Sequence, residues 1–440
     1  MTEPSSVVVG ESARLDEIAA RLRAAVETLR PAMIAFLAEL VRTPSQTGSE
    51  GAAQALIAAR FRAAGLATTV REPTNEELAS FAEHVTEVDS YAGRPNVVGV
   101  LRGADSGRSL ILNGHIDTVE VGDRAQWSHD PLGEIADGRL YGRGSCDMKG
   151  GLATNLFAVL ALQAAGLAPR GDVILQSVIS EEDGGAGALA AVLHGPRADA
   201  AIITEPTRRA IVPAQGGSLM FRIHLTGRSA HGAARDEGVS AIETWAALHR
   251  GLLEFEARRN REIDHPLYRD IGNKIPINVG TLRAGSWPSS VPEWLVAEGR
   301  AGMIPGEDLQ EFKKAFAAEV ARIAERDPWL REHPPIVEWL DGQFAAADIP
   351  VDAPLVNAMA AAHAAIEGEP PPVQAVAYGA DLRHFVLVGG MPCLMYGAGD
   401  VRLAHAPDEC IELDELVAAA ATIATVIAAW CGVTERSADH

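Results

Sequence analysis

Cysteine is scarce in this chain of 440 residues. Its four cysteines lie far apart and without paired spacing: Cys146, Cys393, Cys410 and Cys431. This pattern excludes a disulfide scaffold and a zinc ribbon, both of which need closely spaced cysteines. The first residues also lack a basic stretch followed by an apolar one, so we expect no secretory signal. We therefore expect the protein in a reducing compartment, the cytoplasm.

Basic residues are also in short supply. Lysine and arginine total 38 against 59 aspartates and glutamates, which gives a formal net charge of −21. A surface of this charge repels phosphate groups, so neither nucleic acid nor an anionic membrane is an expected partner. We find no apolar run of the roughly 18 residues that a membrane span needs, so we expect no transmembrane helix.

Apolar material, in contrast, is ample, with 47% hydrophobic residues. The length exceeds the roughly 250–300 residues that one core supports, so two domains are expected. Short apolar runs predict buried strands at 110–112, 173–175, 201–203 and 393–395. Alanine-rich helical stretches separate most of them, at 52–64, 150–166, 185–194 and 354–366. This alternation predicts an α/β layer around a largely parallel sheet. Near the N-terminus, helical spacing predicts one helix that ends at Pro31 and a second that follows it.

The middle of the chain has a different pattern. It predicts a strand at 219–225, a helix at 239–252, strands at 277–279 and 293–303, a helix at 309–323 and a strand at 335–340. The order β-α-β-β-α-β is the ferredoxin-like arrangement. Glycine or proline at 213–217 and 342–353 indicates linkers. We therefore predict a catalytic domain in two parts, 1–215 and 345–440, with a smaller α+β domain at 216–344 inserted between them.

Ionisable residues gather where the predicted buried strands end. His115 and Asp117 follow one strand, and alternate residues of an extended segment point the same way, so both can share one side. A carboxylate beside the far nitrogen of a ligand histidine fixes the tautomer of that ring. The other members of this set are Asp147, Glu181, Glu182, Glu205 and His405. Ligands of open α/β sheets bind at this edge, so we expect the set to converge there.

Each of these features has a structural alternative when taken alone. Asp147 could cap the helix that follows it, and the acidic run 181–183 could be a surface turn. The glycine-rich loop 142–151 could cradle a phosphate, but it lacks both the Walker spacing and the G-x-G-x-x-G spacing. We interpret Cys146 as a small buried filler, because no histidine is paired with it locally.

Imidazole and carboxylate donors without thiolates suit zinc, and manganese or cobalt bind the same donors. We expect two divalent ions at the spacing of about 3.5–4 Å that two-metal hydrolytic sites have. Asp147 is the carboxylate that could bridge them. A carboxylate left over near metal-activated water is what a general base requires. The set therefore predicts a two-metal hydrolytic site.

Six motifs carry a resemblance to a known family. They are Gly114-His115-Ile116-Asp117, Gly142-Arg143-Gly144 with Asp147-Met148-Lys149-Gly150-Gly151, Glu181-Glu182, Glu205-Pro206-Thr207, Ser229-Ala230-His231-Gly232, and His405-Ala406-Pro407-Asp408-Glu409. Over nearly its whole length the chain resembles the acetylornithine deacetylase/succinyl-diaminopimelate desuccinylase group of co-catalytic zinc amidohydrolases, with aminoacylase and bacterial glutamate carboxypeptidases. The resemblance implies a zinc-aminopeptidase-like catalytic domain, a mixed sheet flanked by helices, with an inserted ferredoxin-like lid that also forms a homodimer.

The resemblance also implies the metal ligands. Asp147 would bridge the two ions. His115 and Glu205 would complete one metal site, and Glu182 and His405 would complete the other.

Further roles are implied in the same way. Glu181 would be the general base, and Asp117 would hold His115. His231 would polarise the substrate carbonyl and stabilise the developing oxyanion, and the partner subunit could supply this histidine. Arg300 would bind a substrate carboxylate, a task that suits a guanidinium.

Two positions depart from the family pattern. The family often has Gly-Thr-Asp where this chain has Gly379-Ala380-Asp381, and an Asn-x-x-Pro-like stretch where it has Ser289-Ser290-Val291-Pro292. Both positions usually grip the substrate, so Gly379 is expected to line its binding site. The metal set is intact while the specificity set is altered.

We therefore predict metal-dependent hydrolysis of an amide bond in a small N-acyl amino acid or N-acyl amine. Within the same chemistry, the alternatives are a metallodipeptidase or carboxypeptidase, and a deformylase of N-formyl aminopyrimidines. A non-catalytic, metal-stabilised binding protein is the alternative from another class. A closed structural metal site would use four ligands and leave no base, and Glu181 beside Glu182 argues against it.

Overall fold

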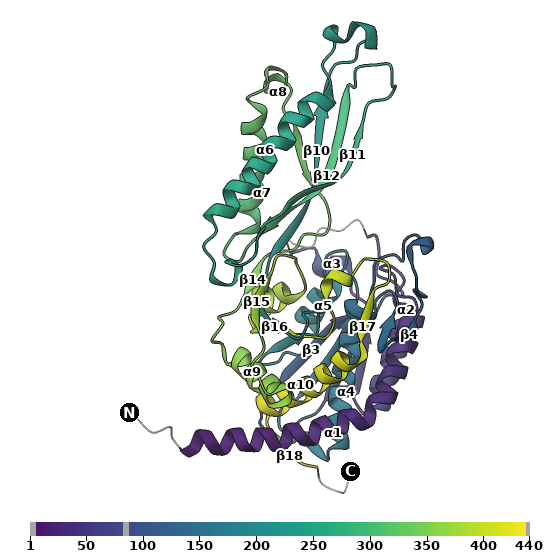
Figure 1. Ribbon diagram of the computed structural model, residues 1–440, viewed down its shortest axis with the longest axis vertical. Coiled ribbons are helices and arrows are strands. Elements are labelled where there is room, and N and C mark those ends of the chain that lie inside the picture. Colours follow the sequence, from purple (N-terminus) through teal and green to yellow (C-terminus); the bar gives the residue numbers. More distant parts are fainter. Residues whose placement is uncertain (1–5, 82–87, 437–440) are drawn as a thin grey trace.

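The computed structural model describes residues 6–81 and 88–436, which form a larger and a smaller part (Figure 1). Within these residues the larger part is built on a nine-stranded sheet. Its strands, in their order across the sheet, are β1 (Ala67–Arg71), β2 (Asn96–Leu101), β7 (Val173–Val178), β3 (Leu110–His115), β8 (Ala201–Ile203), β16 (Cys393–Met395), β9 (Ile211–Gln215) and β14 (Ala347–Asp348), with β15 (Val373–Val376) beside β9.

The centre of this sheet is parallel and its flanks are largely antiparallel. β7, β3, β8 and β16 pair in parallel, whereas β1, β2, β9 and β14 join antiparallel neighbours. The sheet is therefore mixed. The four central strands end at one edge, which is where open α/β sheets bind ligands.

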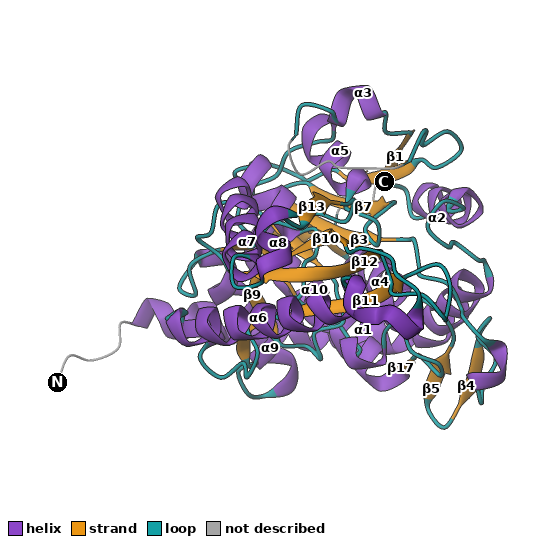
Figure 2. Ribbon diagram, turned by 90° about the horizontal axis from the view of Figure 1, so that it is seen from above, coloured by secondary structure: helices purple, strands orange, loops and turns teal. Residues whose placement is uncertain are grey.

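Helices cover both faces of the large sheet. They are α1 (Ser6–Arg42), α2 (Gly51–Ala63), α3 (Asn75–Leu78), α4 (Gly150–Ala164), α5 (Ala186–His194), α9 (Pro354–Glu367) and α10 (Leu413–Cys431). Leu110 and Leu112 of β3 belong to the core cluster that contains α1, α4 and α10, whereas Ile111 belongs to one with Val192 of α5 and Phe385. Alternate residues of a buried strand face opposite sides, so both faces need cover. Figure 2 shows α1, α9 and α10 on one side of the strands and α3 and α5 on the other.

The N-terminal helix differs from the prediction. α1 continues through Pro31 instead of ending there, and Figure 1 shows it as one bent helix. Proline removes one backbone donor and kinks a helix. Buried Leu22 and Val26 before it, and Met33 and Leu37 after it, lie in one core cluster. This shared packing holds the helix together across the kink.

α10 also corrects the sequence analysis. By length and composition alone, this helix could cross a membrane, although no such run was expected. However, 78% of its apolar window is buried inside the protein, where it packs against α1, α4 and α9. In this structure α10 is a core helix.

The smaller part has its own sheet and core. Its elements are β10 (Gly217–Thr226), α6 (Ala241–Glu262), β11 (Ile277–Ala284), β12 (Trp294–Met303), α7 (Leu309–Ala324), α8 (Pro328–Glu332) and β13 (Ile336–Trp339). The strand order β11-β12-β10-β13 is antiparallel throughout, which confirms the ferredoxin-like fold. Phe221 of β10, Leu248 of α6 and Phe316 of α7 lie in a core separate from that of the large sheet.

The first predicted linker, 213–217, is almost entirely strand, and the second, 342–353, contains one short strand. Gly216 alone separates β9 from β10, and β14 lies within 342–353. The domain limits at 215/216 and 344/345 stay a prediction. Two small sheets complete the larger part: β17 (Cys410–Glu412) with β5 (Arg139–Tyr141) and β4 (Glu134–Ala136), and β18 (Val433–Glu435) with β6 (Leu167–Pro169).

Candidate metal centre and substrate cavity

The predicted ligands converge at the carboxyl edge of the parallel strands. His115 is the last residue of β3, Glu182 follows β7, and Glu205 follows β8. Asp147 comes from the turn η2 (Ser145–Lys149) that leads into α4, and its peptide bond to Met148 is cis. His405 comes from the segment between β16 and β17.

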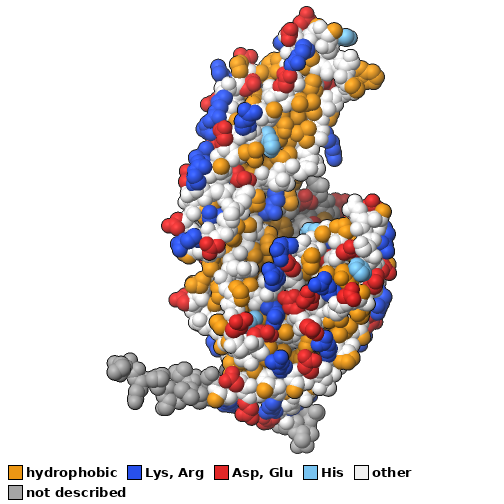
Figure 3. Space-filling view, viewed as in Figure 1, with side chains coloured by type: hydrophobic (Ala, Val, Ile, Leu, Met, Phe, Trp, Pro, Cys, Tyr) orange, Lys and Arg blue, Asp and Glu red, His pale blue; other side chains and the backbone are white. Residues whose placement is uncertain are grey.

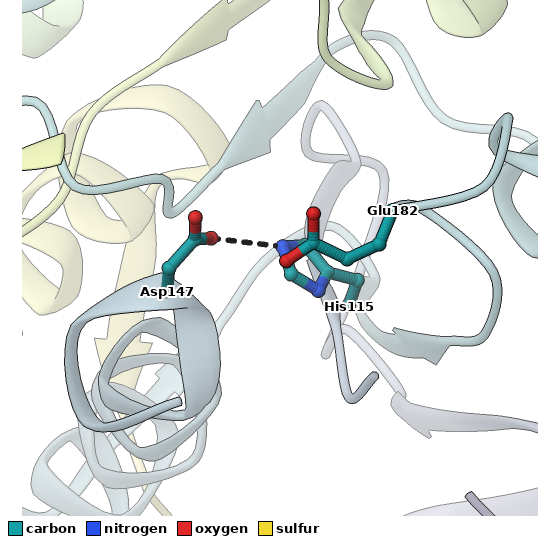
Figure 4. A group of neighbouring side chains, drawn as sticks. All are labelled: His115, Asp147 and Glu182. Atoms are coloured by element: carbon teal, nitrogen blue, oxygen red, sulfur yellow. Dashed lines mark hydrogen bonds and ion pairs between the residues drawn. The ribbon is translucent and has the colours of Figure 1, made fainter. Parts of the chain in front are cut away.

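Asp147 lies between the two histidines. Its Oδ1 is 3.1 Å from His115 Nε2, and its Oδ2 is 3.6 Å from His405 Nε2. Glu205 Oε1 lies 3.8 Å from His115 Nε2, and Glu182 Oε1 lies 3.0 Å from His405 Nε2. Ligand atoms of His115, Asp147 and Glu182 fall within 4.8 Å of one another (Figure 4). Each oxygen of Asp147 thus faces a different histidine, and each histidine has a further carboxylate.

This donor set fits divalent cations. Glu181 and Glu205 are buried close to Asp147 and Glu182 in one cavity. Carboxylates this close repel one another unless positive charge lies among them. Of the described residues that line this cavity, Arg300 is the one lysine or arginine, so little positive charge from the protein offsets the carboxylates. Histidine and carboxylate donors match zinc, cobalt or manganese.

The pKa values report the same crowding. Burial raises the pKa of Glu181 and of Glu205 well above the usual value for glutamate, and neighbouring carboxylates add to this. Burial alone would lower the pKa of His115, but the Asp147 hydrogen bond and the charges of Glu205 and Asp117 raise it well above its usual value. Bound cations would replace these protons and keep the carboxyl groups ionised.

Asp117 supports the site in a way that differs in detail from the prediction. His115 Nδ1 lies 3.0 Å from the main-chain oxygen of Asp117 and 3.6 Å from its carboxylate. The carboxylate accepts hydrogen bonds from the main-chain N–H groups of Glu181, at 3.2 Å, and Glu182, at 3.1 Å. Asp117 therefore orients the histidine mainly through its backbone and fixes the Glu181–Glu182 turn through its side chain.

Glu409 positions the Asp147 turn, a role that the sequence alone did not reveal. Its Oε1 accepts hydrogen bonds from the N–H groups of Cys146, at 3.0 Å, and Asp147, at 3.1 Å. Its Oε2 accepts one from Arg143 Nη1 at 2.6 Å. Arg143 and Glu409 are both buried. Their places inside two of the recognised motifs were the available signal, but their pairing becomes visible only in three dimensions.

Lys149 joins the same turn to the N-terminal helix. It is buried, and its ammonium group donates to the carbonyl oxygens of Leu40, at 3.0 Å, and Thr43, at 2.9 Å. These carbonyls lie at the C-terminal end of α1, where a helix has unpaired acceptors and favours positive charge. The lysine of the Asp147-Met148-Lys149 motif therefore anchors the turn.

A cavity of about 280 Å³ opens beside the predicted metal ligands. Its walls come from both parts of the protein, and Figure 3 shows the molecule hollowed between them. Ser218, Met220 and Arg300 belong to the smaller part, and Tyr378 and Gly379 to the larger. Arg300 and Gly379 thus lie where the sequence analysis expected substrate contacts.

Arg300 is held only partly by the protein. Its Nη2 donates to the carbonyl oxygen of Ala377 at 3.3 Å, and its buried Nε has no hydrogen-bond partner in the part of the chain that the structure describes. Burial lowers the pKa of this guanidinium, which nevertheless stays charged at neutral pH. It can bind an acceptor in the cavity.

The structure does not bring His231 into this cavity. β10 begins one residue after Gly216, whose N–H donates to Val376 O of the larger part, whereas His231 follows the other end of that strand. Figure 1 shows β10 running away from the larger part. His231 is exposed, and its Nδ1 accepts a hydrogen bond from Ala233 N. Within one chain it therefore lies outside the cavity that the predicted metal ligands line.

Comparison with known proteins agrees with this arrangement. The model of peptidase family M20/M25/M40 matches residues 111–429. The N-formyl-4-amino-5-aminomethyl-2-methylpyrimidine deformylase of Bacillus subtilis is 33% identical over 368 residues, covering 78% of this chain and 84% of that protein. The acetylornithine deacetylase of Myxococcus xanthus is 30% identical over 351 residues, covering 78% and 86%.

A solved structure shows the same fold. A tripeptidase from Staphylococcus aureus aligns with a TM-score of 0.68 and 21% identity, over 90% of this chain and 97% of its own. The resemblance to the deacetylase group and the mixed α/β fold are thereby confirmed. The chain belongs to peptidase family M20/M25/M40 and is a hydrolase of that family.

Proposed function

We propose that this protein removes a small acyl group from an amine by two-metal hydrolysis. The observation that carries the proposal is the position of Asp147, with one oxygen toward His115 and the other toward His405. His115 and Glu205 would hold one ion and His405 and Glu182 the other. Zinc is the metal of choice, and cobalt or manganese could bind the same donors.

Two bound ions would polarise the amide carbonyl and make a nearby water easier to deprotonate. Glu181 lines the cavity beside the ligands without being needed as one, so it is free to take the proton of that water. It then returns the proton to the departing amine, as a general base that becomes a general acid. Asp117 holds the Glu181 main chain in place during both transfers.

His231 does not line the cavity of its own chain. It would therefore act in the cavity of a second copy of the chain. Leu282, Trp287 and Ile336 of the smaller part are exposed apolar side chains, and such surface suits a homodimer contact. His231→Ala and Glu181→Gln proteins, each inactive alone, should regain activity when mixed, because a mixed dimer has one intact site. Mixtures that stay inactive would count against this arrangement.

The substrate is proposed to be a small N-acyl amine. The cavity, about 280 Å³, is at the small end for ligand sites. Arg300 favours an N-acyl amino acid, because its free Nε can bind a carboxylate. N-formyl aminopyrimidine is the second candidate, since the B. subtilis relative is named as a deformylase of that compound. The free buried thiols agree with the cytoplasm as the proposed compartment.

A substrate panel separates these candidates. N-acetyl amino acids, an N-formyl aminomethylpyrimidine and dipeptides would be compared by kcat/KM with the zinc-loaded protein. We expect the N-acyl amines to be hydrolysed faster than the dipeptides. Cleavage of dipeptides alone would overturn the proposal in favour of a peptidase.

Replacement of Glu181 tests the mechanism and the non-catalytic alternative together. Glu181→Gln should retain two metal ions per chain and lose at least 10²-fold in kcat, the lower range for a general base. Asp183→Asn is the matched control, because Asp183 lies in the same acidic run but pairs weakly with Arg94, at 4.0 Å. Full activity of Glu181→Gln would contradict the mechanism.

A further inference from the structure

Tyr378 places a hydroxyl group in the cavity with nothing to bind. The residue follows β15 and lines the cavity together with Asp147, Glu181 and Glu205. Its hydroxyl oxygen is buried and has no hydrogen-bond partner among residues 6–81 and 88–436. On the wall that the smaller part contributes, Arg300 Nε also lacks a hydrogen-bond partner within the described part of the chain.

An unpaired buried hydroxyl is costly. Leaving such a group without a partner costs about 1–3 kcal/mol, and native proteins rarely do so without a reason. The other tyrosines of this region follow the rule: the hydroxyl of Tyr268 donates to Val376 O at 3.1 Å, and that of Tyr396 bonds to His363 at 2.7 Å. The hydroxyl of Tyr378 must therefore find its hydrogen-bond partner in a molecule that occupies the cavity.

Tyr378 lines the same cavity as the predicted metal ligands Asp147, Glu182 and Glu205. Burial raises the pKa of Tyr378, and the charges that add to this come from Glu205, Asp147 and Glu181 in that order. A phenol has an ordinary pKa near 10, so it carries its proton at neutral pH and can donate a hydrogen bond. Because Tyr378 and the predicted metal ligands line one cavity, this donor is available where the scissile amide would bind.

We propose that the Tyr378 hydroxyl donates a hydrogen bond to the carbonyl oxygen of the scissile amide and stabilises the negative charge that develops there. This inference rests on the proposed deacylation. Water adds to the carbonyl carbon, the C–N bond breaks, and the proton taken by Glu181 goes to the amine. Tyr378 keeps its own proton throughout, so no bond breaks at the tyrosine.

This role differs from that of His231. His231 does not reach the cavity of its own chain, whereas Tyr378 belongs to the wall of that cavity. A donor within the chain remains in position whether or not a second copy is bound. It would act on the oxygen during the reaction itself, which makes Tyr378 a catalytic residue rather than a positioning one.

The test is Tyr378→Phe in the zinc-loaded protein. Loss of one oxyanion donor lowers kcat by about 10²–10³-fold, and we expect KM to change little. Metal content should be unchanged, since the hydroxyl is not a ligand in this assignment. Tyr268→Phe is the matched control. It removes a buried hydroxyl that donates to the carbonyl oxygen of Val376, two residues before Tyr378, but Tyr268 does not line the cavity. It should keep the wild-type kcat.

A second readout does not depend on turnover. Methylphosphonate imitates the tetrahedral, negatively charged state, and its binding would be measured by calorimetry for the wild type and Tyr378→Phe. We expect the variant to bind it about 10²-fold or more weakly. Unchanged kcat and unchanged methylphosphonate affinity would overturn the role of Tyr378, and so would an effect on KM alone. If the wild type hydrolyses no N-acyl amine, the proposed function fails, whereas the binding comparison still decides whether Tyr378 binds the anion.

Discussion

Replacement of Glu409 by glutamine tests how the metal centre is held together. The Glu409 carboxylate accepts three hydrogen bonds, from the N–H groups of Cys146 and Asp147 and from the Arg143 guanidinium. A glutamine has only one oxygen at its end, and its NH2 group is a donor. Whichever way it turns, a donor faces either Arg143 or the two N–H groups.

The expected loss follows from burial. Arg143 and Glu409 are almost completely shielded from solvent, at 6% and 1% side-chain exposure. Removing one partner of a buried ion pair costs about 3–5 kcal/mol. The loosened turn carries Asp147, and changes to groups that hold metal ligands weaken metal affinity about 10–100-fold. Glu409→Gln should therefore lose both stability and metal binding.

The assay combines urea unfolding of the metal-free protein with zinc titration. Glu412→Gln is the matched control, because Glu412 pairs with Arg139 at 2.8 Å with 57% and 45% of the side chains exposed. Such a surface pair contributes about 0–1 kcal/mol. If Glu409→Gln were as stable as Glu412→Gln and bound zinc like the wild type, the reasoning about the Asp147 turn would be refuted.

Three further predictions concern the cavity wall, a buried acid and the metal. Gly379→Ala should raise KM and cost about 1–3 kcal/mol of stability, because the new Cβ would lie 2.4 Å from Phe344 Cβ. Gly272→Ala is the control: its Cβ would meet no atom within 4 Å, so KM and stability should stay unchanged. Burial raises the pKa of Asp381 to about 6, above its unfolded value near 3.9. Between these two pKa values the folded state binds more protons than the unfolded state, so the free energy of unfolding falls as pH rises. Asp381→Asn should remove about 3 kcal/mol of that fall in urea titrations of metal-free protein, and equal pH slopes would contradict the assignment. A chelator should abolish activity and zinc should restore it; activity that survives chelation would contradict the metal requirement. In thermal unfolding, free zinc at 100 times its Kd should add about 2.7 kcal/mol of stability.

The sequence allowed the convergence of the predicted ligands to be anticipated, because three of them are next to a strong local signal. His115, Glu182 and Glu205 follow short apolar strands, and the carboxyl ends of parallel strands meet at one edge. The ferredoxin-like order was also readable, since its strands and helices have clear two-residue and three-to-four-residue periods. These features depend on local pattern and on a general rule of topology.

Other features depend on contacts between distant segments and could not be predicted in the same way. The pairing of Arg143 with Glu409, and of Lys149 with the end of α1, leaves no periodic trace. Local propensity predicted that a helix ends at Pro31, but packing of the residues on both sides of it keeps α1 continuous. The free hydroxyl of Tyr378 depends on what surrounds it, which only the assembled cavity defines.

The location of His405 and Glu409 late in the chain has a consequence for biosynthesis. His115, Asp147, Glu182 and Glu205 leave the ribosome well before them, and domains generally fold as units during synthesis. Until the segment before β17 emerges, Asp147 has neither its second histidine nor the carboxylate that holds its turn. A nascent chain would therefore offer at most half of the proposed centre, and loading with both ions would wait until this segment has been translated.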